Sequence, residues 1–95
     1  MKKNNKYKID LQEIALKDET SQLKDISFEF ENHDDIFKII DLSKEKNLFD
    51  NANDSVEFTL GLKLFSEVMI KHRKHDLFED FLPHFKTFMQ TLKSQ

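Results

Sequence analysis

Apolar side chains recur with helical spacing over residues 54–74, the longest regularly patterned stretch of the chain. At 100° per residue they fall on one broad face, and Lys63 and Glu67 lie opposite it. Asp54, followed three residues later by Glu57, matches a capping box, so we expect the helix to start there. The face comprises Phe58, Gly61, Leu62, Leu64, Phe65, Val68, Met69 and His72.

Gly61 is the single glycine of the sequence and lies near the middle of that face. A glycine inside a helix costs about 1 kcal/mol relative to alanine, so we expect Gly61 to mark a close crossing with another element. On this basis Gly61→Leu is predicted to destabilise the fold by overcrowding.

Two stretches before this helix alternate apolar and polar residues, as half-buried strands do. We expect them to pair as an antiparallel hairpin, joined by a polar connection at residues 17–24. Because a lone hairpin is marginally stable in water, its apolar face should be covered by helices. The alternating apolar residues are Tyr7, Ile9 and Leu11 in the first strand, and Ile26, Phe28 and Phe30 in the second.

A first helix is expected between the hairpin and the central helix. Asn32 is a suitable N-cap for it, its apolar face extends to Lys46, and Asn47 is a suitable stop. After the central helix, an apolar stripe keeps its phase across Pro83. This predicts either one helix kinked at Pro83, or a single turn followed by a helix that restarts there.

The element order is therefore ββααα, which predicts an α+β fold of two layers. Residues 1–95 are expected to form a single domain, with residues 1–6 as a flexible N-terminal lead. Ten phenylalanines and no tryptophan predict an interior filled by phenyl rings that closes around the central helix.

Composition excludes several classes of protein. Without cysteine there is no disulfide, thiolate nucleophile or Cys-ligated metal. No apolar run could span a membrane and no secretory signal pattern is present, so we expect a cytoplasmic protein. Residues 10–57 carry fourteen acidic and five basic side chains, whereas residues 58–95 carry four and six. Such oppositely charged parts can attract each other within one fold or between two copies.

The segments ENHDDIFKII and GLKLFSEVMIKHRK, followed by a C-terminal helix with proline and aromatic residues, resemble a family of short stand-alone bacterial proteins. That family is catalogued only as a domain of unknown function, and the likeness covers residues 7–93. The resemblance implies a bacterial single-domain protein with a strand–strand–helix opening. It implies no activity, so it assigns no catalytic residue and no cofactor.

The basic cluster at residues 71–75 is a candidate binding surface. It could bind an anion or nucleic acid weakly, but cations in the last turn of a helix are expected for helix stability alone. There is one Arg against fourteen Lys, no aromatic residue interleaves with the cluster, and base readout favours Arg. We therefore expect no nucleic-acid partner. The cluster is Lys71, His72, Arg73, Lys74 and His75.

His72, His75 and Asp76 could form part of a metal site, since imidazoles three residues apart can converge from one helix. This would make the chain a metal-dependent or small-ligand enzyme. However, His72 falls on the apolar face, where we expect a buried histidine, and the spacing names no further ligand. We therefore predict no metal and no cofactor.

A second cluster of ionisable side chains lies where the second strand meets the first helix. A histidine beside carboxylates can perform acid–base chemistry, but helix capping already accounts for most of these residues. We therefore predict no catalytic residue here. The cluster is Glu31, His33, Asp34 and Asp35.

Three apolar residues of the central helix, Val56, Leu60 and Ile70, lie outside its main face. Together with Lys71, Arg73 and Lys74 they form a candidate interaction surface. A two-stranded sheet also leaves open edges that can pair with a second copy. The sequence therefore favours a protein-interaction or structural module that forms a homodimer, and the enzyme and the anion binder are the alternatives.

Overall fold

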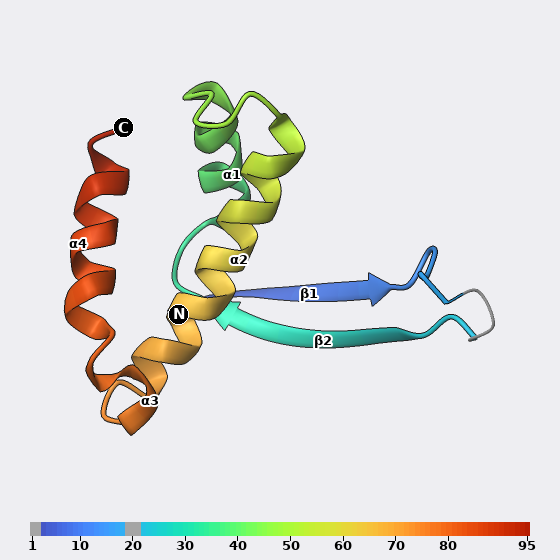
Figure 1. Cartoon of the computed structure of the whole chain (residues 1–95), viewed down its shortest axis with the longest axis horizontal. Coiled ribbons are helices and arrows are strands. Elements are labelled where there is room, and N and C mark those ends of the chain that lie inside the picture. Colours follow the sequence, from blue (N-terminus) through green and yellow to red (C-terminus); the bar gives the residue numbers. More distant parts are fainter. Residues whose placement is uncertain (1–2, 19–21) are drawn as a thin grey trace. The chain divides into compact units, whose positions relative to one another are not determined.

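The computed structural model describes residues 3–18 and 22–95. The fold is α+β, as predicted: an antiparallel hairpin is followed by helices, of which the described part contains four, one of them short (Figure 1). The elements are β1 (Asn5–Gln12), β2 (Asp25–Asn32), α1 (Ile36–Glu45), α2 (Ala52–Lys71), α3 (Asp76–Glu79) and α4 (Leu82–Lys93).

The chain divides into two compact units, residues 1–34 with the hairpin and residues 35–95 with the helices. Within the described residues, no helix combines the length and the apolar character needed to cross a membrane.

The hairpin pairs β1 and β2 residue for residue from Asn5 opposite Asn32 to Gln12 opposite Asp25. The backbone N–H of Glu13 donates to the Lys24 carbonyl oxygen at 2.8 Å and extends the same register by one pair. Both strands therefore run slightly beyond their alternating apolar residues. Residues 19–21 of the predicted connection, and residues 1–2 of the predicted lead, lie outside the described part.

The start of α1 differs from the prediction. Asp35 is the N-cap, and its carboxylate accepts a hydrogen bond from the Lys38 N–H at 3.2 Å. Asn32 does not cap the helix, because its side chain accepts instead from the Asp34 N–H in the preceding turn. The predicted stop is confirmed: Asn47 has a φ of 51°, the left-handed conformation that terminates helices.

The start of α2 also lies earlier than predicted. Asn51 is its N-cap and accepts a hydrogen bond from the Asn53 N–H at 2.8 Å. Asp54, the predicted start, is instead an acidic residue in the first turn, where it meets the positive end of the helix. The Asx turn at Asn51 therefore starts the helix at Ala52, two residues before Asp54.

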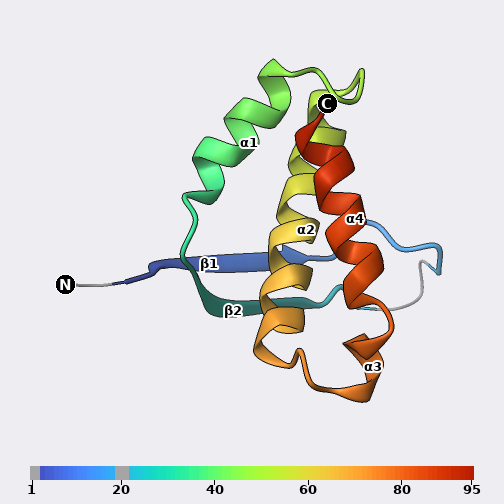
Figure 2. The same cartoon turned by 90° about the vertical axis from the view of Figure 1, so that its left-hand side faces the viewer.

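The alternative of a single turn followed by a second helix is confirmed, but the second helix begins at Leu82, one residue before Pro83. The chain forms the single turn α3 and then α4, in which Pro83 is the second residue. Proline needs no N–H partner in the first turn of a helix, so this position accommodates it without loss of a hydrogen bond. Figure 2 shows α4 running back along α2 after the turn.

Gly61 is not a close crossing point. A Cβ added there would meet no atom within 4 Å, so the expected crowding is absent at that position. The buried small residues of α2 are instead Ser55 and Thr59, which are 0% and 3% exposed. Thr59 lines a hollow together with Ile39 of α1, and small side chains there let α1 approach α2 closely.

The predicted phenylalanine-filled interior is also wrong. None of the ten phenylalanines is buried, and the buried hydrophobic residues of the described part are Ile36 and Met69. The rings of Phe58 and Phe65 instead form edge-to-face contacts with other phenylalanine rings beside α2. Phe65 contacts Phe81 and Phe85 with ring centroids 5.9 and 6.5 Å apart. Phe65, Phe81 and Phe88 remain 45%, 41% and 44% exposed.

Candidate functional site

The apolar face of the hairpin carries several exposed large apolar side chains. Cross-strand pairing brings its side chains together in three directly opposed pairs, and such pairs are the unit that stabilises a sheet. Leu11, Ile26 and Phe28 remain 64%, 58% and 42% exposed. The pairs are Tyr7 with Phe30, Ile9 with Phe28, and Leu11 with Ile26.

The opposite face of the hairpin is charged, and the two strands differ in their charge. β1 carries Lys6, Lys8 and Asp10, whereas β2 carries acidic side chains and no basic one. The Lys6 ammonium lies 3.1 Å from the Glu29 carboxylate, but both side chains are more than half exposed. Such an exposed pair contributes at most about 1 kcal/mol, so these charges act chiefly on what approaches the hairpin.

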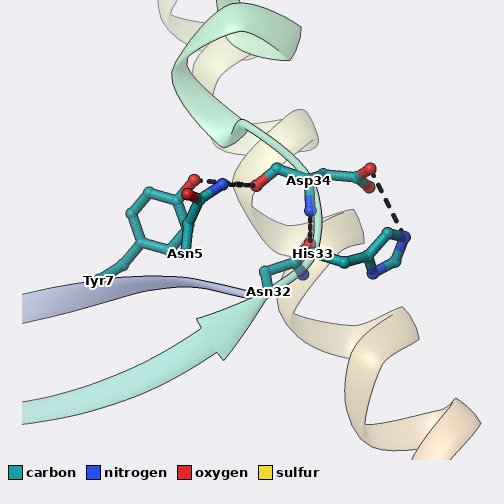
Figure 3. Close-up of polar contacts among 5 residues, drawn as sticks. All are labelled: Asn5, Tyr7, Asn32, His33 and Asp34. Atoms are coloured by element: carbon teal, nitrogen blue, oxygen red, sulfur yellow. Dashed lines mark hydrogen bonds and ion pairs between the residues drawn. The ribbon is translucent and has the colours of Figure 1, made fainter. Parts of the chain in front are cut away.

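Hydrogen bonds join the start of β1 and the end of β2 to the turn at Asp34 (Figure 3). The Tyr7 hydroxyl and the Asn5 side-chain amide both donate to the Asp34 carbonyl oxygen, at 2.9 and 3.2 Å. The Asn32 side chain, 1% exposed, accepts from the Asp34 N–H at 2.9 Å. Tyr7 thus contributes its ring to the apolar face, and its hydroxyl links β1 to the turn that follows β2.

The ionisable cluster predicted where β2 meets α1 consists of Glu31, His33, Asp34 and Asp35, and local contacts engage three of them. His33 Nε2 lies 3.5 Å from the Asp34 carboxylate, and its side chain is 63% exposed. Asp35 caps α1, and Glu31 lies exposed on the charged face of the hairpin. The geometry therefore accounts for these side chains as turn, cap and surface residues.

The helical unit contains an apolar groove of about 410 Å³ between α2 and α4. Phenylalanine side chains from both helices form most of its walls, and Gly61 leaves its floor open. Phe65 is 45% and Phe88 44% exposed in it. The groove residues are Glu57, Phe58, Gly61, Leu62, Phe65, Phe81, Phe85 and Phe88.

A smaller hollow of about 200 Å³ lies among α1, α2 and the end of α4. Its walls are mainly aliphatic and its rim carries Lys46, Lys63 and Lys93, with no acidic side chain among the lining residues. Gln95, the last residue of the sequence, also lies on this rim.

The basic cluster forms the turn after α2. Residues 70–75 line one shallow hollow, so Ile70, Lys71, Arg73 and Lys74 of the predicted interaction surface lie together. Val56 and Leu60 do not join them, because they are half-buried and ten or more residues earlier on α2.

His72 is exposed at the C-cap of α2, so its predicted burial on the apolar face is wrong. The reason is that α2 ends at Lys71, one residue before the histidine. His75 Nδ1 accepts from the Leu77 N–H at 3.0 Å and caps α3, while Asp76 is the first residue of α3. Within residues 3–18 and 22–95, no three His, Asp or Glu side chains are arranged to hold a metal ion.

Sequence reasoning did not identify the exposed hairpin face as a candidate surface. The alternation of apolar residues was clear, but alternation shows which side chains share a face and not whether that face is covered. The Phe-lined groove was missed for a similar reason, since a regular apolar stripe on each of two helices fits tight and loose packing equally well.

Residues 5–94 match the family described as a domain of unknown function with solved structure (DUF3861). The chain belongs to this family. The resemblance stated from the sequence is thereby confirmed. No curated protein matches the chain.

A crystal structure of a protein of unknown function from Pectobacterium atrosepticum is similar to it, with 39% sequence identity and a TM-score of 0.84. The match covers 97% of this chain and 99% of that protein. The relative is a bacterial protein.

Proposed function

We propose that the chain is a protein-interaction module that binds its partner through the apolar face of the hairpin, and that a second copy of the chain is such a partner. The observation that carries the proposal is the exposure of Leu11, Ile26 and Phe28 on one face of a two-stranded sheet. Contiguous exposed apolar surface of this kind marks interaction sites in soluble proteins.

The low stability of a two-stranded sheet supports the same proposal. Two strands alone are marginally stable in water, whereas three or more strands with a covered apolar face are stable. A partner that adds strands or covers the face would therefore stabilise the hairpin as it binds.

The proposal is tested with the chain immobilised and an untagged copy offered in solution. Ile9→Thr/Leu11→Thr removes the two apolar side chains that β1 contributes to this face beside Tyr7, and retains strand propensity, since threonine favours strands. The matched control is Ile70→Gln/Leu77→Gln, which removes two apolar side chains that are 52% and 71% exposed at the other candidate surface.

We expect the wild-type chain and the control to retain the untagged copy, and the hairpin variant to lose it. Retention by the hairpin variant together with loss in the control would contradict the proposal and move the interaction to the end of α2. Equal retention by all three would also contradict it. Circular dichroism of each variant verifies that the helices are intact.

A further inference from the structure

The outer edge of β1 has unpaired backbone groups at defined residues. The Glu13 N–H donates to the Lys24 carbonyl oxygen and the Lys24 N–H donates to the Glu13 carboxylate, so Glu13 and Lys24 occupy a hydrogen-bonded position of the antiparallel ladder. Hydrogen-bonded and non-hydrogen-bonded pairs alternate along such a ladder. Ile9 therefore directs its N–H and C=O toward β2, whereas Lys8 and Asp10 direct theirs outward. In the described part of the chain the sheet has two strands, so no third strand takes up these groups.

We infer that two copies of the chain join along this edge, β1 against β1, in the antiparallel register centred on Ile9. In that register Lys8 of each copy lies directly opposite Asp10 of the other, and Lys6 lies opposite Gln12. All four residues have outward-facing backbone groups, so the pairing satisfies the hydrogen-bonding pattern of the ladder. The two-fold axis repeats the Lys8–Asp10 pair, and no like charges are opposed.

Neighbouring registers are less favourable. An axis through Lys8 would oppose the two Lys8 side chains, and an axis through Asp10 would oppose the two Asp10 carboxylates. Like charges directly opposite each other on neighbouring strands are destabilising. Lys8 is exposed and, among the residues that the structure describes, no salt bridge engages it. Its charge is therefore available to a second copy.

The outer edge of β2 does not offer the same contact. Its outward-facing residues are Asp25, Ser27, Glu29 and Glu31, and β2 contains no basic residue. Any antiparallel pairing of β2 with itself therefore lacks an attractive charge pair, and acidic side chains protect this edge from further association. The contact through β1 thus closes as a symmetric dimer with two acidic outer edges.

The dimer also extends the apolar face on which the proposed function rests. Tyr7 lies opposite Leu11 of the second copy, and Ile9 lies opposite its own counterpart. These are non-hydrogen-bonded pairs, in which side chains approach most closely. The result is a four-stranded sheet with a continuous apolar face, large enough to be stable where one hairpin is marginal.

Charge exchange between Lys8 and Asp10 tests the register. Lys8→Glu and Asp10→Lys each place like charges opposite each other twice, and we expect each to weaken the dimer about tenfold or more in sedimentation equilibrium. An equimolar mixture of the two variants should form a heterodimer at wild-type strength. In the mixture, position 8 of each chain again faces an opposite charge at position 10 of the other.

Asp25→Lys is the control, because it makes the same charge change as Asp10→Lys on the outer edge of β2. It should leave the dimer unchanged.

Failure of the mixed variants to associate, or equal weakening by Asp25→Lys, would overturn the register while leaving an interaction through the hairpin face intact. A wild-type chain that is monomeric at every concentration would overturn the dimer, and assemblies that grow beyond a dimer would indicate pairing of β1 with β2 instead. Circular dichroism and the mixing experiment together distinguish a broken contact from an unfolded variant.

Discussion

The Tyr7 hydroxyl donates a 2.9 Å hydrogen bond to the backbone carbonyl oxygen of Asp34, twenty-seven residues along the chain. The bond joins the start of β1 to the turn that follows β2, and the Tyr7 ring stacks on Phe30 with centroids 5.4 Å apart. One side chain thus ties the end of the hairpin and contributes to its apolar face, which holds the face in a single register.

Tyr7→Phe should lower the free energy of unfolding by about 1 kcal/mol, because it removes a part-buried hydrogen bond and keeps the ring. Asn5→Ala is the comparison, since Asn5 donates to the same oxygen from an exposed position at 3.2 Å and should cost less. Urea denaturation of both variants measures the difference. Equal costs for the two substitutions would show that the Tyr7 hydroxyl does not close the hairpin.

Gly61→Ala should stabilise the protein by about 0.5–1 kcal/mol. The added methyl group meets no atom within 4 Å, and alanine has the higher helix propensity at an interior position. Thermal and urea unfolding both report the change. A loss of stability would instead place another element against Gly61, as the sequence had suggested.

Ser55 is completely buried, and within the described residues its hydroxyl has no hydrogen-bond partner. Ser55→Ala should therefore be neutral or stabilising by about 0.5 kcal/mol, because it breaks no hydrogen bond and favours the helix. Ser55→Leu should cost about 1–3 kcal/mol by overpacking the approach of α1 to α2. Urea denaturation measures both changes. Opposite effects of the two substitutions would establish that Ser55 lies on the crowded face of α2. A tolerated leucine would contradict it.

Phe65 joins α2 to the C-terminal helices through contacts with three rings, those of Phe78, Phe81 and Phe85. Phe65→Ala should lower the free energy of unfolding by about 2 kcal/mol, since each aromatic pair contributes about 0.5–1.5 kcal/mol and the ring is partly exposed. Leu77→Ala, at a side chain that is 71% exposed, should cost much less. Similar losses for both would show that the edge-to-face contacts do not secure α4.

The sequence predicts the hairpin, the break at Pro83 and the stop at Asn47 correctly because each depends on local chemistry. Alternation defines the two faces of a strand, proline lacks an N–H, and asparagine tolerates a left-handed backbone. The helix starts were less well predicted, because Asn32 and Asp35, or Asn51 and Asp54, are equally good capping residues. Local geometry alone decides between them.

The burial of particular residues could not be predicted in the same way. The Gly61 and phenylalanine predictions assumed close packing on the apolar face of α2. Ring-edge contacts instead leave a groove there, while Ser55 and Thr59 are buried on a face that periodicity did not select. Helical spacing assigns residues to faces, but the distance of the neighbouring helix depends on side-chain shape across the interface.

The central claim is that the hairpin binds a second copy of the chain. Amide hydrogen exchange in the hairpin tests this claim most directly. Exchange at Lys8 and Asp10, whose N–H groups face outward from β1, should slow markedly between dilute and concentrated protein. Exchange at Ser27 and Glu29, on the outer edge of β2, should not depend on concentration. If all four amides exchange at rates independent of concentration, the hairpin does not join two copies of the chain.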